Sequence, residues 1–301
     1  MLLIIGSYCK GSIRCPWHGA CFNVRNGDIE DFPGLDNLPS FKTKVVKGEI
    51  FVEQNEFLGK SKFTPPMVKY SGKDSDGSVV IVGGGAAGLT CSESLRQSGY
   101  QGRIVILAKE NCLPYDRPKL SKAADVEVEK IYLRPPEFYK ENDIEVFTSH
   151  EVVHLDVNAK TVVTKNGEEF PYDKLVVCSG GDPRTLTCPG SHLENISYLR
   201  TPADSKTIYG LCDEKQIVVI GSSFIGMELA CHFVSGKHKA KSVTVVGRAA
   251  RPLDLVFGAE IGNRIQQLYE SNEIKFQMST AVKEFRGETE VKEVVLDNGN
   301  V

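Results

Sequence analysis

Residues 79–107 read VVIVGGGAAGLTCSESLRQSGYQGRIVIL, and this stretch decides the fold class. The apolar run 79–82 predicts a buried strand, a helical pattern follows it, and RIVIL at 103–107 predicts a second strand. Three glycines between the first strand and the helix form the pattern G-x-G-x-x-G: Gly83, Gly85 and Gly88. Strand, glycine turn, helix and strand within about 30 residues are typical of a dinucleotide-binding βαβ unit.

The three glycines have separate physical tasks in such a unit. The first permits a tight turn, the second lets the backbone approach a pyrophosphate, and the third lets the helix pack closely on the strand. The diphosphate then lies at the positive end of the helix. An acidic residue about 20 residues further on is expected to bind the ribose, and Glu110 is the candidate. The alternative is a solvated loop glutamate beside Lys109.

A second βαβ unit begins with QIVVIGSSFIGMELACHF at residue 216 and runs to SVTVVGR, which ends at residue 248. Its glycine pattern keeps Gly221 and Gly226, while Ser223 replaces the middle glycine. Serine is small, so the backbone can still approach a phosphate, with less room than glycine would leave. The two units lie far apart in the chain and therefore predict two separate nucleotide folds.

The composition sets limits on the class of protein. The chain has 301 residues, 41% hydrophobic and 25% charged, which is ordinary for two globular domains and a small third. A net charge of −3 gives no basic bias for nucleic acid. Nine irregularly spaced cysteines do not predict a secreted disulfide framework. We expect an intracellular compartment, cytoplasmic or mitochondrial, and no transmembrane segment.

The segment LPYDRPKLSK at 113–122 names a family. Together with the first glycine pattern it resembles the pyridine-nucleotide-disulfide-reductase-like flavoproteins, which include ferredoxin reductases of oxygenase systems and the apoptosis-inducing-factor group. The resemblance covers residues 79–301. It implies FAD in the first nucleotide site and NAD(P)H in the second. It also implies that Arg117 lies by the FAD phosphates and that Lys122 lies near the flavin ring.

The resemblance extends to further site residues. A cation such as Lys122 beside the flavin tunes its electronics, and Glu228 would lie at the flavin edge, pair with Lys122 and orient the nicotinamide. LVVCSGG at 175–181, with Gly180 and the following Arg184, resembles the family's strand that returns under the FAD. The alternatives for Lys122 and Glu228 are surface residues on helices.

The end of the strand VTVVG bears on coenzyme choice. NADH-dependent members of the resembled family usually carry an acid there, whereas this chain has Gly247 followed by Arg248 and Arg251. Loss of the acid removes a partner for the 2′-hydroxyl, and arginines accept a 2′-phosphate. The sequence therefore predicts that NADPH is tolerated or preferred. Two solvated arginines are the alternative.

The motif Cys15-Pro-Trp-His18-Gly near the N-terminus resembles the second ligand hairpin of Rieske [2Fe–2S] proteins. A Rieske centre takes two cysteines and two histidines, so a C-x-H hairpin is also required, and the sequence contains none. We therefore expect a partial ligand set of Cys15 and His18, with the cluster assembled in a full-length parent rather than by this chain alone. A zinc ion held by these two residues with Cys9 and Cys21 is a weaker alternative.

Together these features predict an α/β protein with two Rossmann-like domains and a small all-β partial Rieske module of the Rieske-containing apoptosis-inducing-factor type. The expected parts are the Rieske module, a linker, the FAD-binding domain and the NAD(P)-binding domain: 1–53, 54–77, 78–197 and 198–301. The predicted function is an FAD-dependent oxidoreductase that passes electrons from NAD(P)H via FAD to a Rieske-type centre or an unknown acceptor. The alternatives are a pro-apoptotic signalling or interaction protein with structural nucleotide sites, or an inactive fragment, because the family pattern continues past both ends.

Overall fold

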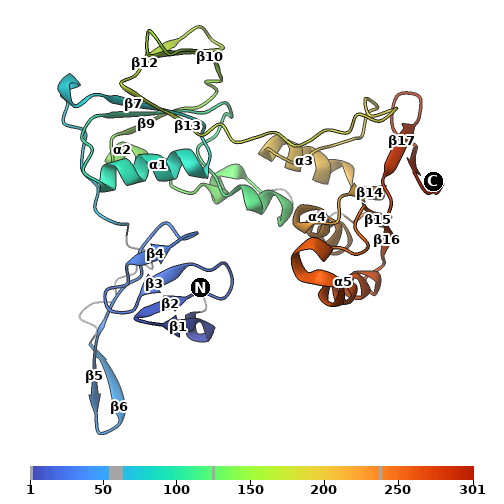
Figure 1. Ribbon diagram of the computed structural model, residues 1–301, viewed down its shortest axis with the longest axis horizontal. Helices are drawn as coiled ribbons and strands as arrows, with labels where there is room; N and C mark the ends of the chain where they lie inside the picture. The colour runs from blue at the N-terminus through green and yellow to red at the C-terminus, as the bar shows by residue number, and fades with distance from the viewer. Residues whose placement is uncertain (1–2, 54–63, 124–125, 237–238) are drawn as a thin grey trace. The chain divides into compact units, whose positions relative to one another are not determined.

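A computed structural model describes residues 3–53, 64–123, 126–236 and 239–301 (Figure 1). The chain divides into two compact units, one of residues 1–71 with 93–101 and one of residues 72–92 with 102–301. The predicted linker, 54–77, lies partly outside the described residues.

The first unit contains a small antiparallel sheet in the order β1-β2-β3-β4 after a short 3-10 helix, η1 (Leu3–Ile5). The strands are β1 (Ser7–Cys9), β2 (Ser12–Arg14), β3 (Cys21–Asn23) and β4 (Ile29–Asp31). Cys15, Ala20 and Phe22 form its buried centre. A second hairpin, of β5 (Lys42–Val46) and β6 (Glu49–Glu53), turns at Lys47 and Gly48. Both turn residues have positive φ, as a two-residue hairpin turn requires.

The first glycine pattern lies in a parallel sheet of the second unit, in the order β13-β7-β8-β9. Its strands are β7 (Ser78–Val82), β8 (Arg103–Leu107), β9 (Ile144–Phe147) and β13 (Lys174–Val177). The predicted strand, turn and helix are confirmed, because β7 leads through the glycines into α1 (Ala86–Gln97). The short helices of this part are η2 (Asp74–Asp76), η3 (Arg117–Ser121), η4 (Val128–Ile131) and α2 (Pro136–Glu141).

An antiparallel meander packs on this parallel sheet. It consists of β10 (Val152–Asp156), β11 (Thr161–Thr164) and β12 (Glu169–Pro171). Val162 and Phe170 of the meander are buried against Val80 and Val105 of the sheet. Figure 1 shows the meander on one face of the sheet and α1 on the other. The central strands are therefore buried on both faces, which explains their continuous apolar runs.

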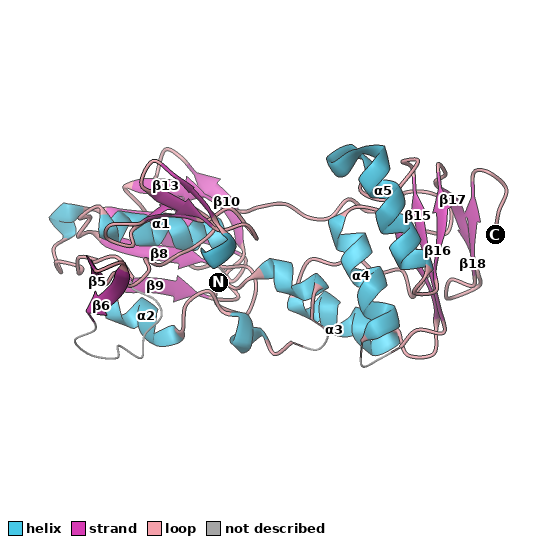
Figure 2. Cartoon of the chain, turned by 90° about the horizontal axis from the view of Figure 1, so that it is seen from below, coloured by secondary structure: helices cyan, strands magenta, loops and turns pink. Residues whose placement is uncertain are grey.

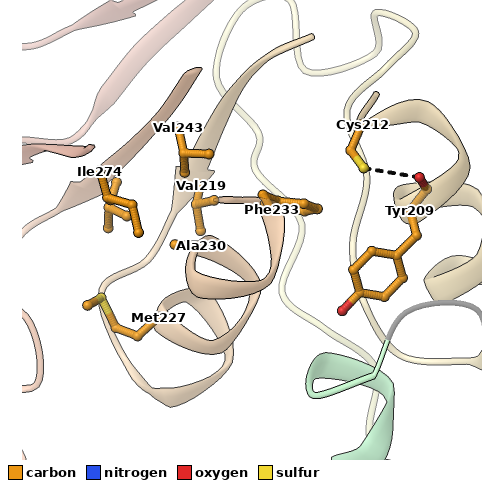
Figure 3. Packing of buried hydrophobic residues seen from close by; sticks show 9 residues of the cluster. Tyr209, Cys212, Val219, Met227, Ala230, Phe233, Val243 and Ile274 are labelled. Carbon is orange, nitrogen blue, oxygen red and sulfur yellow. Dashed lines mark hydrogen bonds between the residues drawn. The ribbon is translucent and has the colours of Figure 1, made fainter. Parts of the chain in front are cut away.

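The second glycine pattern lies in another parallel sheet, in the order β14-β15-β16. Its strands and helices are β14 (Gln216–Ile220), β15 (Ser242–Gly247), β16 (Ile274–Met278), α3 (Pro202–Leu211), α4 (Phe224–Ser235) and α5 (Asp254–Glu270). Helices α4 and α5 cover one side of this sheet (Figure 2). Figure 3 shows its core, where Met227, Ala230 and Phe233 of α4 meet Val219, Val243 and Ile274 of the sheet.

The last described elements form a hairpin of β17 (Val282–Arg286) and β18 (Glu293–Leu296). Among the helices of the described residues, none has the length and apolar character needed to cross a bilayer.

Candidate active site

The first glycine loop has two positions at which only glycine fits. Gly83 has φ +124°, and a Cβ there would lie 2.1 Å from the carbonyl oxygen of Cys178. A Cβ on Gly88 would lie 2.2 Å from the oxygen of Gly83. Both obstacles are backbone atoms, so they cannot move as a side chain can. The loop is therefore pressed between the start of α1 and the end of β13.

Gly85 differs from its neighbours because a Cβ there would meet nothing within 4 Å. Its carbonyl accepts the first hydrogen bond of α1, from the N–H of Leu89 at 3.1 Å. The protein's own packing thus gives no reason for a glycine at this position. An open backbone at the start of a helix is the feature that a dinucleotide pyrophosphate needs. The residues present therefore fit the FAD that the sequence implies.

The second glycine loop repeats this arrangement. Gly221 has φ +117° with open space around its Cβ position, whereas a Cβ on Gly226 would lie 1.9 Å from the oxygen of Gly221. Ser223 precedes α4, and its hydroxyl makes no capping hydrogen bond to the helix. The start of α4 therefore has no side-chain cap, just as it would have none with glycine at 223, and its backbone fits a second dinucleotide.

Lys122 and Glu228 come from different nucleotide folds and meet. Lys122 follows η3, and its Nζ lies 2.9 Å from Oε1 of Glu228 in α4. The hydroxyl of Ser121 donates to the other carboxylate oxygen at 2.5 Å. The structure thus brings together the two residues predicted to act at the flavin, and it adds Ser121, which sequence reasoning missed. The one feature of the sequence that could have indicated Ser121 as a site residue is its position in the segment 113–122, next to Lys122.

Glu110 and Arg117 also meet, through a network that the sequence did not indicate. Nη2 of Arg117 lies 2.7 Å from Oε1 of Glu110. The hydroxyl of Tyr115 donates to Oε2 of Glu110 at 2.8 Å. Burial, and next the hydrogen bond to Glu110, raise the pKa of Tyr115, so it stays a protonated donor. Arg117 also donates to the backbone oxygen of Arg200 at 2.5 Å. Both oxygens of the Glu110 carboxylate therefore have partners inside the protein.

The remaining predicted FAD contacts are placed around the end of β13. Gly180 has φ +71°, and its Cβ position lies 3.0 Å from Nη2 of Arg200. Arg184 is exposed four residues later. Glycine is required at 180 for its backbone angle, while Arg184 is free to reach a ligand.

The predicted coenzyme-specificity position, Gly247, is tightly packed. A Cβ there would lie 2.5 Å from Oγ of Ser222 and 2.9 Å from Cε of Met278. Arg248 is exposed. Nε of Arg251 donates to Oδ1 of Asn263 at 2.6 Å. Of the two arginines, Arg248 is thus exposed, whereas Arg251 is already held by Asn263.

The partial Rieske ligand set does not form a metal site. Cys15 is buried in the small apolar core, and its N–H donates to the oxygen of Ala20 at 2.8 Å. His18 is exposed. No group of three or more His, Cys, Asp or Glu residues within the described ranges is placed to hold a metal. The geometry gives no support to the zinc alternative, because Cys9, Cys15, His18 and Cys21 all lie in the described part and form no such group. A two-iron cluster does not fit these residues either.

The comparison with protein families supports this geometry. The profile described as Pyridine nucleotide-disulphide oxidoreductase matches residues 77–301. This chain belongs to the pyridine nucleotide-disulphide oxidoreductase family. A second profile, described as Rieske [2Fe-2S] domain, matches residues 1–42 of the same chain. This family member is therefore α/β with a Rieske-type N-terminal module, as predicted.

Known relatives of this pyridine nucleotide-disulphide oxidoreductase include Apoptosis-inducing factor 3 from Homo sapiens, which is 43% identical over 99% of this chain and 50% of the relative. Rubredoxin-NAD(+) reductase from Pseudomonas putida is 35% identical over 73% of this chain and 58% of the relative. The crystal structure of the covalent putidaredoxin reductase–putidaredoxin complex matches with a TM-score of 0.68 and 30% identity, over 74% of this chain and 55% of that one. The chain thus spans about half the length of the relatives it matches.

Proposed function

We propose that this protein is an FAD-dependent oxidoreductase that passes electrons from NAD(P)H through FAD to a one-electron acceptor of the iron–sulfur type. The observation that carries the proposal is the Lys122–Glu228 pair at 2.9 Å, one residue from each nucleotide fold. The names of the relatives support it, since one is a rubredoxin reductase and another is a putidaredoxin reductase joined to putidaredoxin. The predicted division into an FAD domain, 78–197, and an NAD(P) domain, 198–301, is part of the proposal.

The protein's own residues would hold and orient the two dinucleotides. Gly83, Gly85 and Gly88 would hold the FAD pyrophosphate, with Gly180 and Arg184 at its other side. A bound flavin supplies the conversion of a two-electron donor into one-electron steps. Lys122 would place a positive charge beside the flavin ring, and Glu228 would orient the nicotinamide of NAD(P)H bound at Gly221 and Gly226.

Arg117 would approach the FAD phosphates while Glu110 and Tyr115 hold its guanidinium. The 2.7 Å ion pair leaves Nε and one hydrogen of Nη2 for a ligand. Glu110 would then bind the ribose through lone pairs that Arg117 and Tyr115 do not use. A carboxylate has about four acceptor sites, so these tasks are compatible.

We propose that the electron acceptor is supplied from outside the described residues. Cys15 and His18 do not suffice for a [2Fe–2S] cluster, so no electron-transfer step is assigned to them. None of the nine cysteines, all within the described ranges, forms a disulfide, which agrees with a reducing, intracellular compartment. We do not propose a signalling function, because no contact in the described ranges favours it over redox chemistry.

The proposal is tested by NAD(P)H-driven reduction of an artificial acceptor with FAD-loaded protein. We expect Lys122→Ala to lower turnover at least tenfold, since the variant loses the charge beside the flavin. The control is Lys119→Ala, an exposed lysine in the same η3 segment, which should behave as the wild type. Equal turnover of Lys122→Ala and wild type would contradict the assignment of the site.

A further inference from the structure

Two donors of different chemistry hold the carboxylate of Glu228. The Ser121 hydroxyl donates to Oε2 at 2.5 Å, and the Lys122 ammonium lies 2.9 Å from Oε1. Ser121 is 4% exposed, whereas the side chain of Lys122 is 46% exposed. One oxygen thus has a buried neutral partner, and the other has a long, half-exposed cation.

Helix α3 fixes the backbone that carries Ser121. The hydroxyl of Ser205 donates to the carbonyl oxygen of Leu120 at 3.1 Å. The hydroxyl of Tyr209 lies 3.5 Å from that oxygen and 3.4 Å from the oxygen of Ser121. Burial raises the pKa of Tyr209 to about 12, so it remains a donor at neutral pH. The position of the Ser121 hydroxyl oxygen therefore depends on rotation about a single side-chain bond, whereas the Lys122 ammonium is carried by four rotatable bonds.

Both donors have a second acceptor in the carbonyl oxygen of Pro118. It lies 3.2 Å from Oγ of Ser121 and 3.3 Å from Nζ of Lys122. A buried donor without any partner would destabilise the fold, but here neither donor loses its last partner when Glu228 is absent. The Ser121 hydroxyl therefore does not need Glu228 as a hydrogen-bond acceptor. The consequence of their contact is instead that the Glu228 carboxylate is held in one position.

We propose that Ser121 is a positioning residue that keeps the Glu228 carboxylate in place while Lys122 turns from it toward the bound flavin. The inference rests on the proposed function. An ion pair alone would release Glu228 each time the lysine moved, because the side chain of Glu228 has three rotatable bonds of its own. The buried hydroxyl removes that freedom without placing a second charge beside the flavin.

The experiment measures the rate of flavin reduction by NAD(P)H in FAD-loaded wild type, Ser121→Ala, Glu228→Ala and the double variant. We expect Ser121→Ala to slow reduction about tenfold, the size usual for a hydrogen bond to a charged group. In the Glu228→Ala background, which has no side-chain acceptor for the Ser121 hydroxyl, the same substitution should change the rate by less than twofold. The control is Ser92→Ala, which removes another buried hydroxyl, one that donates to the carbonyl oxygen of Leu89, and it should stay within twofold of wild type.

Each outcome decides the inference. Non-additive rates support it, whereas an unchanged Ser121→Ala rate, or an equal loss in both backgrounds, overturns it while leaving the proposed function intact. If Ser121→Ala does not retain flavin, Ser121→Cys, with a weak donor in place of the hydroxyl, takes its place with the same expectations. If NAD(P)H does not reduce the flavin of the wild type, the proposed function fails and the inference fails with it.

Discussion

Replacing Gly85 with alanine separates the binding of FAD from the folding of the protein. A methyl group at Gly85 meets no protein atom within 4 Å, and its φ is outside the left-handed region. Alanine lowers the entropy of the unfolded chain, worth about 0.4–1 kcal/mol of stability. It is a poorer helix N-cap than glycine, which costs a similar amount. We therefore expect the unfolding free energy of the flavin-free protein to change by less than about 1 kcal/mol.

The effect on FAD should be larger. A methyl group at Gly85 would occupy space that the pyrophosphate needs to approach the backbone. Overpacking of this kind costs about 1–3 kcal/mol, here of the free energy of FAD binding. That corresponds to a dissociation constant raised roughly 5- to 150-fold. Gly88→Ala should instead destabilise the fold itself, since its Cβ would lie 2.2 Å from the Gly83 oxygen.

The assay is quenching of flavin fluorescence at 25 °C for binding, with urea unfolding of the flavin-free protein for stability. Gly210→Ala is the matched control, because Gly210 also has open space around its Cβ position and lies in α3. Wild-type FAD affinity in Gly85→Ala would refute the reasoning, because the open backbone would then have no ligand to admit.

Two further predictions concern the second nucleotide fold. Arg248→Ala should raise KM for NADPH about tenfold and leave KM for NADH unchanged, with the exposed Arg264→Ala as control; equal effects on both coenzymes would contradict a 2′-phosphate contact. Burial lowers the pKa of His232 below its ordinary 6.5, so its contribution to stability is complete above pH 6.5 and is lost as the pH falls through the folded-state pKa. His232→Phe should therefore weaken the loss of unfolding free energy between pH 7 and pH 5, and an unchanged pH slope would rule out this histidine as a cause.

The two nucleotide folds could be predicted because their signals are local. Each glycine pattern stands within one turn of a strand end, and the backbone clashes at Gly83, Gly88 and Gly226 are set by neighbours along the same βαβ unit or at the adjoining strand. The apolar runs that precede Gly83 and Gly221 likewise predict the strands β7 and β14. Prediction was therefore reliable where the physical reason for a residue lies close to it in sequence.

The contacts of the site could not be derived in the same way. Ser121 and Glu228 lie 107 residues apart, and nothing in either segment indicates that the hydroxyl, rather than the lysine alone, reaches the carboxylate. The same holds for Glu110, which was selected for its distance from the glycines. Its partner Arg117 is seven residues away, and Tyr115 bridges the pair, because its hydroxyl accepts from Arg117 and donates to Glu110.

The missing acid of the second fold is a matter of packing as well as of charge. Gly247 ends β15, and its Cβ position lies 2.9 Å from Cβ of Ser222 and 2.5 Å from its Oγ. A rotation of the serine would move Oγ but not Cβ, so no side chain fits at 247 while Ser222 is present. The second residue of the glycine loop and the end of the neighbouring strand are thus coupled: the serine beside the phosphate loop excludes the acid that would hold a 2′-hydroxyl. Because of that coupling, the first side chain after β15 is that of the exposed Arg248. We therefore expect the preference between NADH and NADPH to depend on Arg248.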